Sequence, residues 1–462
     1  MEIKTRAKRC LALLLAMAFM GMMLAGCGSQ GSGKDASDGE AAAGASTSQA
    51  QAQEKRTDYS GVKIEMLNTK AEIEDQLEAA AKEWGALTGA TLNVYTIGSG
   101  APSTEISARY AAGNAPALIM GDIQDIVTCV KSGYARDLKD QSWAKNGGLT
   151  YGYNKDGNLY SFPLCIEGRG LLYNKTAIEK TLGRDWDPSE TKSMDDLKKL
   201  FDELVKGGME TPVALNQEDW SLGAHYLALV YEEQGEKLED GEKYIRALAD
   251  GSEKIEDNAR FKSLFDTFDL LMQYNSNRED PLAADYASNA ADLAEGDIAF
   301  WFNGNWGWAE ISEYYEDGTE LGIMPVPQND ADNHAQEWLA GSASKPIMVD
   351  TKNNDEKQQA AALDFLDWLA NTKEGNQVLV EKCSLIPAFS NIKEQATNGL
   401  AKSVQQAANE GRLFPGIIDY PGDHWSTLGA TMQKYLGGKI DRAELGKEID
   451  AYWAKQKLEP WN

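Results

Sequence analysis

The chain has 462 residues, a hydrophobic content of 42% and a formal net charge of −27 at pH 7. Its length exceeds what one hydrophobic core usually supports, which predicts two lobes. Its acidity disfavours nucleic acids and anionic lipid headgroups as partners, because a negative surface repels phosphate groups.

The N-terminus predicts export. Four basic side chains lie within the first nine residues, and residues 10–25 form an apolar run, as in a secretion signal. The run is shorter than the roughly 20 residues that a membrane-spanning helix needs. It ends in Leu24-Ala25-Gly26-Cys27, which resembles a bacterial lipobox. The resemblance implies cleavage before Cys27 and acylation of that residue with diacylglycerol and palmitate, and the alternative is an ordinary secreted protein.

Composition changes after Cys27. Residues 28–55 are rich in Gly, Ser, Ala and Gln, which predicts a disordered tether that we extend to residue 59. The remaining cysteines are Cys129, Cys165 and Cys383, an odd number at wide spacing. We expect all three to be free thiols, although the sequence does not exclude a disulfide between two of them. No spacing of Cys or His predicts a metal site, and no cofactor is expected.

The first predicted elements alternate between strand and helix. Apolar patterns predict strands at 62–67, 91–97 and 117–120, and helices at 73–87 and 101–112. The segment Gly98-Ser99-Gly100 predicts a turn between the second strand and the second helix. This order is typical of a parallel α/β unit, whose binding loops follow the carboxyl ends of the strands.

Helical patterns dominate the rest of the chain. Residues 154–158 predict a turn, and residues 159–172 form an extended run that can cross between lobes. The other predicted elements are helices at 194–206, 222–234, 259–274, 357–370, 400–409 and 425–436, a strand at 298–302 and an extended segment at 343–349.

Four segments in order carry a family resemblance. They are 111–117 (AAGNAPA) with the loop at 121–123, 159–164 (LYSFPL) with 170–175 (GLLYNK), 295–306 (EGDIAFWFNGNW), and 361–369 (AALDFLDWL) with 374–375. Together they resemble the family 1 extracellular solute-binding proteins of ABC transporters, the group that includes maltose-binding protein. The chain departs from the family at Ala117, where Asp is common, and at Ile298-Ala299, where Ala-Met is common.

The resemblance implies an α/β fold of the two-lobed periplasmic-binding-protein type, in which each lobe is a sheet flanked by helices and crossing strands form a hinge. Lobe one is expected at 60–166 plus 348–395, and lobe two at 167–347 plus 396–462, with hinges near 165–168 and 342–344. It also implies a monomeric, lipid-anchored receptor on the outer face of the cytoplasmic membrane. Such a receptor is no enzyme, and it captures a carbohydrate, here an oligosaccharide, for the ABC permease subunits.

A sugar site needs flat aromatic rings for the C–H face of the sugar, and amides and carboxylates for its hydroxyls. By resemblance Trp306 is the stacking tryptophan, whereas Trp301 and Trp308 are interpreted mainly as packing residues. The predicted ligand-binding residues are Asp122, Glu167, Asp219, Trp220, Asn303, Asn305, Trp306, Trp338 and Trp425.

Several alternatives stay open at this level. Asp219 could be a helix N-cap, Glu167 could pair with Arg169, and Trp338 and Trp425 could serve packing. An extracellular glycosidase would need two facing carboxylates, which an acidic chain can supply. The same fold could also bind a polyamine, a peptide or another solute. Only three histidines and no nucleophile elbow are present, which disfavours zinc and serine hydrolases.

Overall fold

The computed structural model describes residues 56–98, 102–329 and 334–459. The predicted secretion signal, the Cys27 lipidation site, tether residues 28–55 and most of the turn at 98–100 lie outside the described residues. The last tether residues contact the folded chain. Arg56 forms an ion pair with Asp364 at 3.3 Å, and the Tyr59 ring lies 6.5 Å from that of Trp84.

The strands form two main sheets and one hairpin. The first sheet has the order β11-β3-β1-β2, the second has the path β12-β10-β6-β8-β7 with β9 also paired to β6, and β4 pairs with β5. The strands are β1 Lys63–Asn68, β2 Thr91–Thr96, β3 Leu118–Met120, β4 Asn154–Lys155, β5 Asn158–Leu159, β6 Cys165–Asn174, β7 Val213–Ala214, β8 Phe300–Gly304, β9 Leu321–Met324, β10 Leu339–Ser344, β11 Ile347–Val349 and β12 Leu413–Phe414.

Helices supply most of the remaining structure. They are α2 Glu74–Thr88, α3 Pro102–Ala112, α4 Ile123–Lys131, α5 Gly148–Tyr151, α6 Lys175–Leu182, α7 Met194–Lys206, α8 Leu227–Glu232, α9 Leu238–Asp250, α10 Ala259–Tyr274, α11 Tyr286–Glu295, α12 Trp308–Ile311, α13 Glu356–Asn371, α14 Lys373–Gln377, α15 Gly399–Asn409, α16 His424–Leu436 and α17 Arg442–Trp453. Two π-helical segments, η5 Trp220–Tyr226 and η10 Val378–Lys382, and the short 3-10 turn η8 Asn305–Gly307 complete the elements used below.

The first lobe is the part of the chain built on the four-stranded sheet. Its β1 pairs in parallel with β2 and β3, and β11 runs antiparallel to β3. Side chains alternate between the two faces of a strand, so Met66 and Leu67 enter different cores. Met66 packs in the cluster with residues of α2 and α13, and Leu67 packs with residues of α3 and α4. Helices therefore cover both faces of this sheet, as expected for parallel strands.

The second lobe is the part of the chain built on the larger sheet. Neighbouring β6 residues again enter different cores, because Leu171 packs with residues of α7, α8, α10 and α16, whereas Leu172 packs with residues of α11 and α15. The fold is thus α/β with two lobes, each a sheet flanked by helices. This confirms the predicted fold class.

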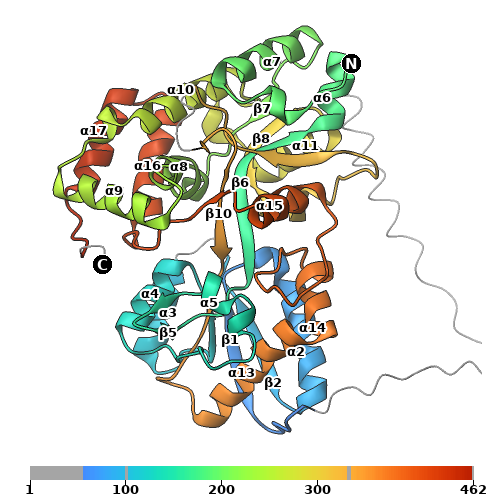
Figure 1. Cartoon of the computed structure of the whole chain (residues 1–462), viewed down its shortest axis with the longest axis vertical. Helices are drawn as coiled ribbons and strands as arrows, with labels where there is room; N and C mark the ends of the chain where they lie inside the picture. Colours follow the sequence, from blue (N-terminus) through green and yellow to red (C-terminus); the bar gives the residue numbers. More distant parts are fainter. Residues whose placement is uncertain (1–55, 99–101, 330–333, 460–462) are drawn as a thin grey trace, which may run out of the picture. The chain divides into compact units, whose positions relative to one another are not determined.

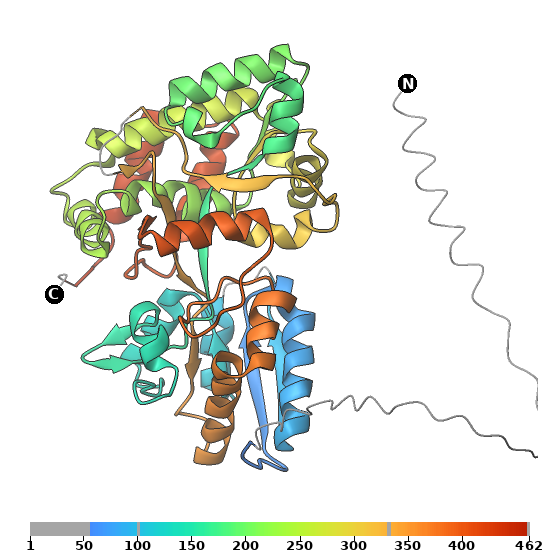
Figure 2. The same cartoon turned by 45° about the vertical axis from the view of Figure 1, so that its right-hand side comes forward.

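Two neighbouring strands connect the lobes. Phe162 bridges to Ile347 in the first lobe, and β6 then pairs antiparallel with β10 from Cys165–Ser344 to Arg169–Ala340. After β10 only Lys345 and Pro346 intervene before β11 joins the first sheet. Figures 1 and 2 show β6 and β10 running side by side between the two sheets. Residues at the predicted hinge segments therefore face one another across this strand pair.

Three predicted elements differ in detail from the structure. The strand predicted at 298–302 begins at Phe300, because the Ile298 N–H instead donates to the Asp292 carbonyl at the end of α11. The helix predicted at 222–234 begins two residues earlier and is π-helical up to Tyr226. The extended segment at 343–349 is interrupted at Lys345, whose φ is 50°. The three cysteines of the described residues, Cys129, Cys165 and Cys383, are buried free thiols.

Candidate ligand site

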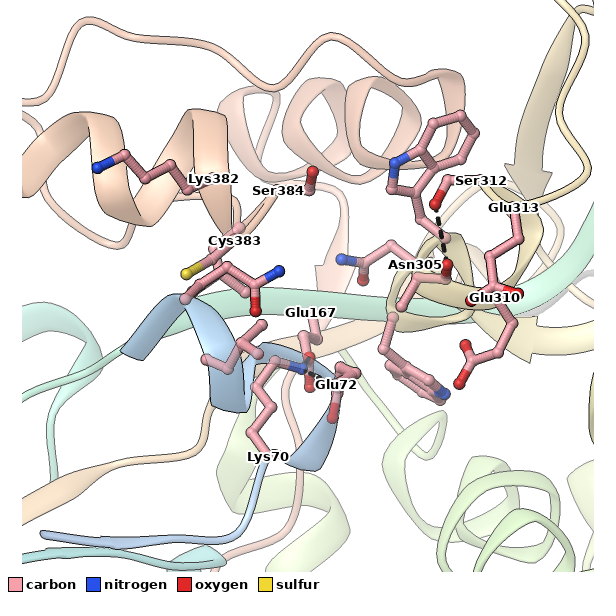
Figure 3. Close-up of a pocket in the computed structure, with 16 residues that line it drawn as sticks. Lys70, Glu72, Glu167, Asn305, Glu310, Ser312, Glu313, Lys382, Cys383 and Ser384 are labelled. Carbon is pink, nitrogen blue, oxygen red and sulfur yellow. Dashed lines mark hydrogen bonds and ion pairs between the residues drawn. The ribbon is translucent and has the colours of Figure 1, made fainter. Parts of the chain in front are cut away.

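A cavity of about 360 Å³ is lined by residues of both lobes. The first lobe contributes the segment after β1 and the end of η10, and the second lobe contributes η8 and α12. Figure 3 shows the charged side chains Lys70, Glu72, Glu167 and Glu310 gathered around this space, whereas the ammonium of Lys382 points away from them.

Lys70 is fixed at the carboxyl end of β1 by a local turn. The Asn68 side chain accepts a hydrogen bond from the Lys70 N–H at 2.9 Å and donates one to the Lys70 carbonyl at 3.1 Å. The Lys70 side chain is only 3% exposed, and its ammonium contacts Glu167 at 2.5 Å and Glu72 at 2.7 Å. Burial alone would lower the pKa of Lys70, but the two carboxylates hold it well above its usual value. The cavity therefore contains a permanent cation between two acids.

Glu167 lines the cavity, as predicted, but its partner is not Arg169. The Arg169 guanidinium instead forms an ion pair with Glu232 on α8 and donates to the His225 carbonyl at 3.3 Å. Successive side chains on a strand point to opposite faces, so Glu167 and Arg169, two positions apart, share a face. Each of them nevertheless pairs with a different residue of opposite charge.

The aromatic part of the cavity comes from the segment after β8. Trp306 and Trp308 both line it, together with Asn305. The Asn305 side-chain oxygen accepts a hydrogen bond from the Gly168 N–H at 2.9 Å, which ties this segment to the crossing strand β6. Trp308 also packs on Tyr315, with ring centroids 5.1 Å apart, so it combines the predicted packing role with a place in the cavity wall.

Trp301 is fully buried, in agreement with its interpretation as a core residue. Its indole N–H donates to the Asn216 side chain at 2.8 Å. Asn303 follows on the same strand, is also buried, and donates to the Tyr286 hydroxyl at 2.9 Å. Asn303 is not among the residues that line the cavity. Its polar group therefore ties β8 to α11 in this structure.

Asp219 and Trp220 stand at the beginning of η5. The Asp219 carboxylate accepts a hydrogen bond from the Trp220 N–H at 2.8 Å, which is the capping role weighed as its alternative. The Trp220 ring lies 5.3 Å from that of His225 and 5.8 Å from that of Tyr286. Because His225 in turn lies 4.6 Å from Trp306, Trp220 belongs to an aromatic group that continues from the cavity wall.

The remaining three predicted ligand residues lie outside the cavity lining, as do Asp219, Trp220 and Asn303. Asp122 precedes α4 and forms an ion pair with Lys345 at 2.8 Å. Trp338 stacks on His334 and packs against Phe414, with both centroid distances at 5.3 Å. Trp425 is half-buried in the first turn of α16.

Sequence reasoning missed Lys70, Glu72 and Glu310, which line the cavity. A signal existed for the first two, since they follow the first predicted strand and loops after parallel strands carry binding residues. Glu310 gave no comparable signal, because its position depends on how α12 packs.

The acidic pair Asp122 and Asp125 provides a test of the electrostatics beside the cleft. Burial, and after it the Asp122 carboxylate, raise the pKa of Asp125 from 3.8 to about 7. The folded state therefore favours the protonated form of Asp125. The resulting contribution to the free energy of unfolding is complete below pH 3.8 and is lost as the pH rises through about 7. We expect Asp125→Asn to gain stability relative to the wild type as the pH rises, by up to about 4 kcal/mol, in urea unfolding at acidic and neutral pH.

Asp196 is the matched control, because it occupies the same capping-box position on α7. A hydrogen bond from the Ser193 hydroxyl lowers the pKa of Asp196, so its contribution is present at neutral pH and is lost on acidification. The pH trend for Asp196→Asn should have the opposite sign. A stability difference between wild type and Asp125→Asn that is constant with pH would contradict the assignment.

Two lobes joined by adjacent strands, with a cavity lined from both, define a ligand-binding protein of the two-lobed class. Residues 79–409 match the model of the bacterial extracellular solute-binding protein family. The chain belongs to this family, which confirms the resemblance inferred from its sequence. As a member of a family of binding proteins, it is a receptor rather than an enzyme.

Solved structures share the fold. The solute-binding protein RafE in complex with raffinose has a TM-score of 0.71 and 18% identity, with 85% of this chain and 99% of that chain covered. A sugar transporter protein from Bacillus licheniformis in complex with stachyose has a TM-score of 0.66 and 18% identity, covering 85% and 100%. A chitin oligosaccharide binding protein has a TM-score of 0.67 and 19% identity, covering 84% and 98%. No curated protein matches the chain.

Residues 56–98, 102–329 and 334–459 contain no helix with the length and hydrophobicity that a membrane span requires. Within the same residues, no group of three or more His, Cys, Asp and Glu side chains is arranged to hold a metal ion.

Proposed function

We propose that the protein captures a carbohydrate, most suitably an oligosaccharide, in the cavity between its lobes. The observation that carries this proposal is the combination of Trp306 and Trp308 with Asn305, Glu72 and Glu167 around one cavity. Indole rings stack on the C–H face of a sugar, while amide and carboxylate oxygens accept hydrogen bonds from its hydroxyls. The raffinose, stachyose and chitin oligosaccharide named for the similar structures support this ligand class.

The same proposal assigns the bound sugar to an ABC importer. Lobe one comprises 60–166 plus 348–395 and lobe two 167–347 plus 396–462, with hinges near 165–168 and 342–344. Sheet membership supports a boundary near residue 347, since β10 ends at Ser344 in the larger sheet and β11 begins at Ile347 in the first sheet. A ligand that contacts both lobes favours the closed form by its differential affinity, and the closed form is what permease subunits would recognise.

The receptor acts outside the cytoplasmic membrane, in line with its extracellular family. We propose that it is a monomer anchored to the outer face of that membrane through acylated Cys27. The lipobox-like Leu24-Ala25-Gly26-Cys27 and the polar segment that follows support this anchoring. Metabolic labelling with a palmitate analogue should mark the wild type, and labelling that persists in Cys27→Ala would contradict the assignment.

A thermal-shift screen tests the ligand class. A ligand that binds only the folded state must raise the melting temperature. The screen contains monosaccharides, oligosaccharides, amino acids and polyamines. We expect one class of oligosaccharides to raise the melting temperature, and we expect no release of sugar products. Silence with every sugar would contradict the carbohydrate assignment.

Polyamines are the second candidate class, because a specific feature favours them. Glu310 and Glu313 line the cavity without an ion-pair partner among the described residues, and burial followed by the nearby Glu72 carboxylate raises the pKa of Glu310. Uncompensated carboxylates favour a cationic ligand. A rise in melting temperature with spermidine alone would support the receptor function but replace the carbohydrate by a polyamine as the ligand.

A further inference from the structure

His225 occupies an unusual position beside the proposed sugar site. It lies in η5, the π-helical segment Trp220–Tyr226, and π-helical turns are rare and frequent at functional sites. Its ring stands between two indoles, 5.3 Å from Trp220 and 4.6 Å from Trp306. Because Trp306 lines the cavity, the three rings form a continuous aromatic wall that begins at the ligand site.

The two ring nitrogens of His225 differ in their surroundings. The Nδ1 atom is buried and has no hydrogen-bond partner among the described residues. The Nε2 atom is not among the enclosed atoms, and no hydrogen bond to it is formed within the described part of the chain. The imidazole is only half-buried. One edge of the ring is therefore enclosed, whereas the other is not. His225 is not itself among the residues that line the cavity, and it adjoins the cavity through its contact with Trp306.

Cations surround this histidine. Arg169 on β6 donates to its carbonyl, and Lys345 approaches from the link between β10 and β11. The facing acids are already paired, Glu232 with Arg169 and Asp122 with Lys345. Burial, and after it Arg169 and Lys345, lower the pKa of His225 well below its usual value. The imidazole is consequently neutral at neutral pH.

We propose that His225 is a ligand contact that selects an uncharged, hydroxyl-bearing unit of the solute held against Trp306. A neutral imidazole nitrogen can donate or accept, and a sugar hydroxyl can do both, so the two groups match in either tautomer. A carboxylate on the sugar could accept only a single hydrogen bond from the neutral imidazole, without the opposite charge that a protonated imidazole would supply. The inference rests on the proposed function and specifies the chemistry of one subsite within it.

Calorimetric titrations of the whole protein test the contact, with raffinose, stachyose, chitotetraose and trigalacturonate as probes at about pH 5 and about pH 8. For the neutral sugar that binds, we expect wild-type affinity to change less than about two-fold between these pH values. His225→Phe, which keeps a ring but no polar atom, should weaken binding by about ten-fold at both. His225→Gln should recover part of the loss, because its amide can still donate or accept.

His334 supplies the matched control, since it is exposed and pairs with Glu236 and Glu337. His334→Phe should bind the probe as the wild type does, and the melting temperature of each variant separates lost contacts from lost folding. Neutral-sugar affinity equal in His225→Phe and wild type overturns the inference and leaves the proposed function intact. Tighter binding of trigalacturonate at low pH would contradict the selection of an uncharged unit by His225. No binding of any neutral sugar overturns the proposed function as well.

Discussion

Replacing Trp306 by Ala is expected to lower sugar affinity by at least about ten-fold. Its indole lines the cavity and contacts His225, so truncation removes the stacking surface on the side of the second lobe. Aromatic stacking and burial of this kind contribute roughly 1 to 3 kcal/mol, and about 1.4 kcal/mol corresponds to ten-fold. Calorimetric titration of the variant with the best sugar of the screen measures the loss.

Trp338 is the matched control for this substitution. It is another half-buried tryptophan of the second lobe, but it packs on His334 and Phe414 and is not among the residues that line the cavity. Trp338→Ala should therefore leave affinity within about two-fold of the wild type. Equal affinities of Trp306→Ala and wild type would remove Trp306 from the site, and a large loss in Trp338→Ala would extend the site toward β12.

Replacing Lys70 by Met is expected to destabilise the protein by about 3 to 5 kcal/mol, the usual effect of removing one partner from a buried ion pair. Lys70 is 3% exposed and Glu167 is 12% exposed, so the Glu167 carboxylate would lose its counter-charge in a poorly solvated place. Glu72 would add like-charge repulsion once the ammonium between the two acids is gone. Urea unfolding at neutral pH measures the loss.

Lys382 provides the control lysine of the same cavity. It pairs with Glu83 at 3.3 Å, and both side chains are well exposed, so Lys382→Met should cost less than about 1 kcal/mol. Adding Glu167→Gln to Lys70→Met should restore part of the lost stability, because the unpaired charge is removed. A double variant no more stable than Lys70→Met would show that the ion pair is not the cause.

Much of the fold could be predicted from the sequence, because apolar periodicity and local caps determine its elements. The helix predicted at 259–274 is α10 within the same bounds, and an Asn258 cap fixes its start. The helix predicted at 357–370 differs from α13 by one residue at each end. Where tertiary contacts decide, prediction was less accurate. The start of β8 depends on the hydrogen bonds of Ile298, and the π-helical form of η5 on its packing against α16.

The candidate site was predicted only in part. Local motifs identified Glu167, Asn305 and Trp306, which lie on a crossing strand or directly after a core strand. The acids and cations that meet them come from distant segments. Lys70 reaches Glu167 across 97 positions, and such pairings follow from lobe packing rather than from any local pattern. For the same reason the sequence alone did not indicate that Arg169 pairs with Glu232 rather than with Glu167.

The most direct test of carbohydrate capture between the lobes is one calorimetric titration of the purified protein with stachyose, raffinose and chitotetraose. We expect at least one of them to bind once per chain, with a negative heat-capacity change from burial of the aromatic wall. The same titration of Trp306→Ala should give much weaker heat. Absence of binding by all three sugars, with clear binding of spermidine or a peptide, would contradict carbohydrate capture while retaining the solute-binding fold.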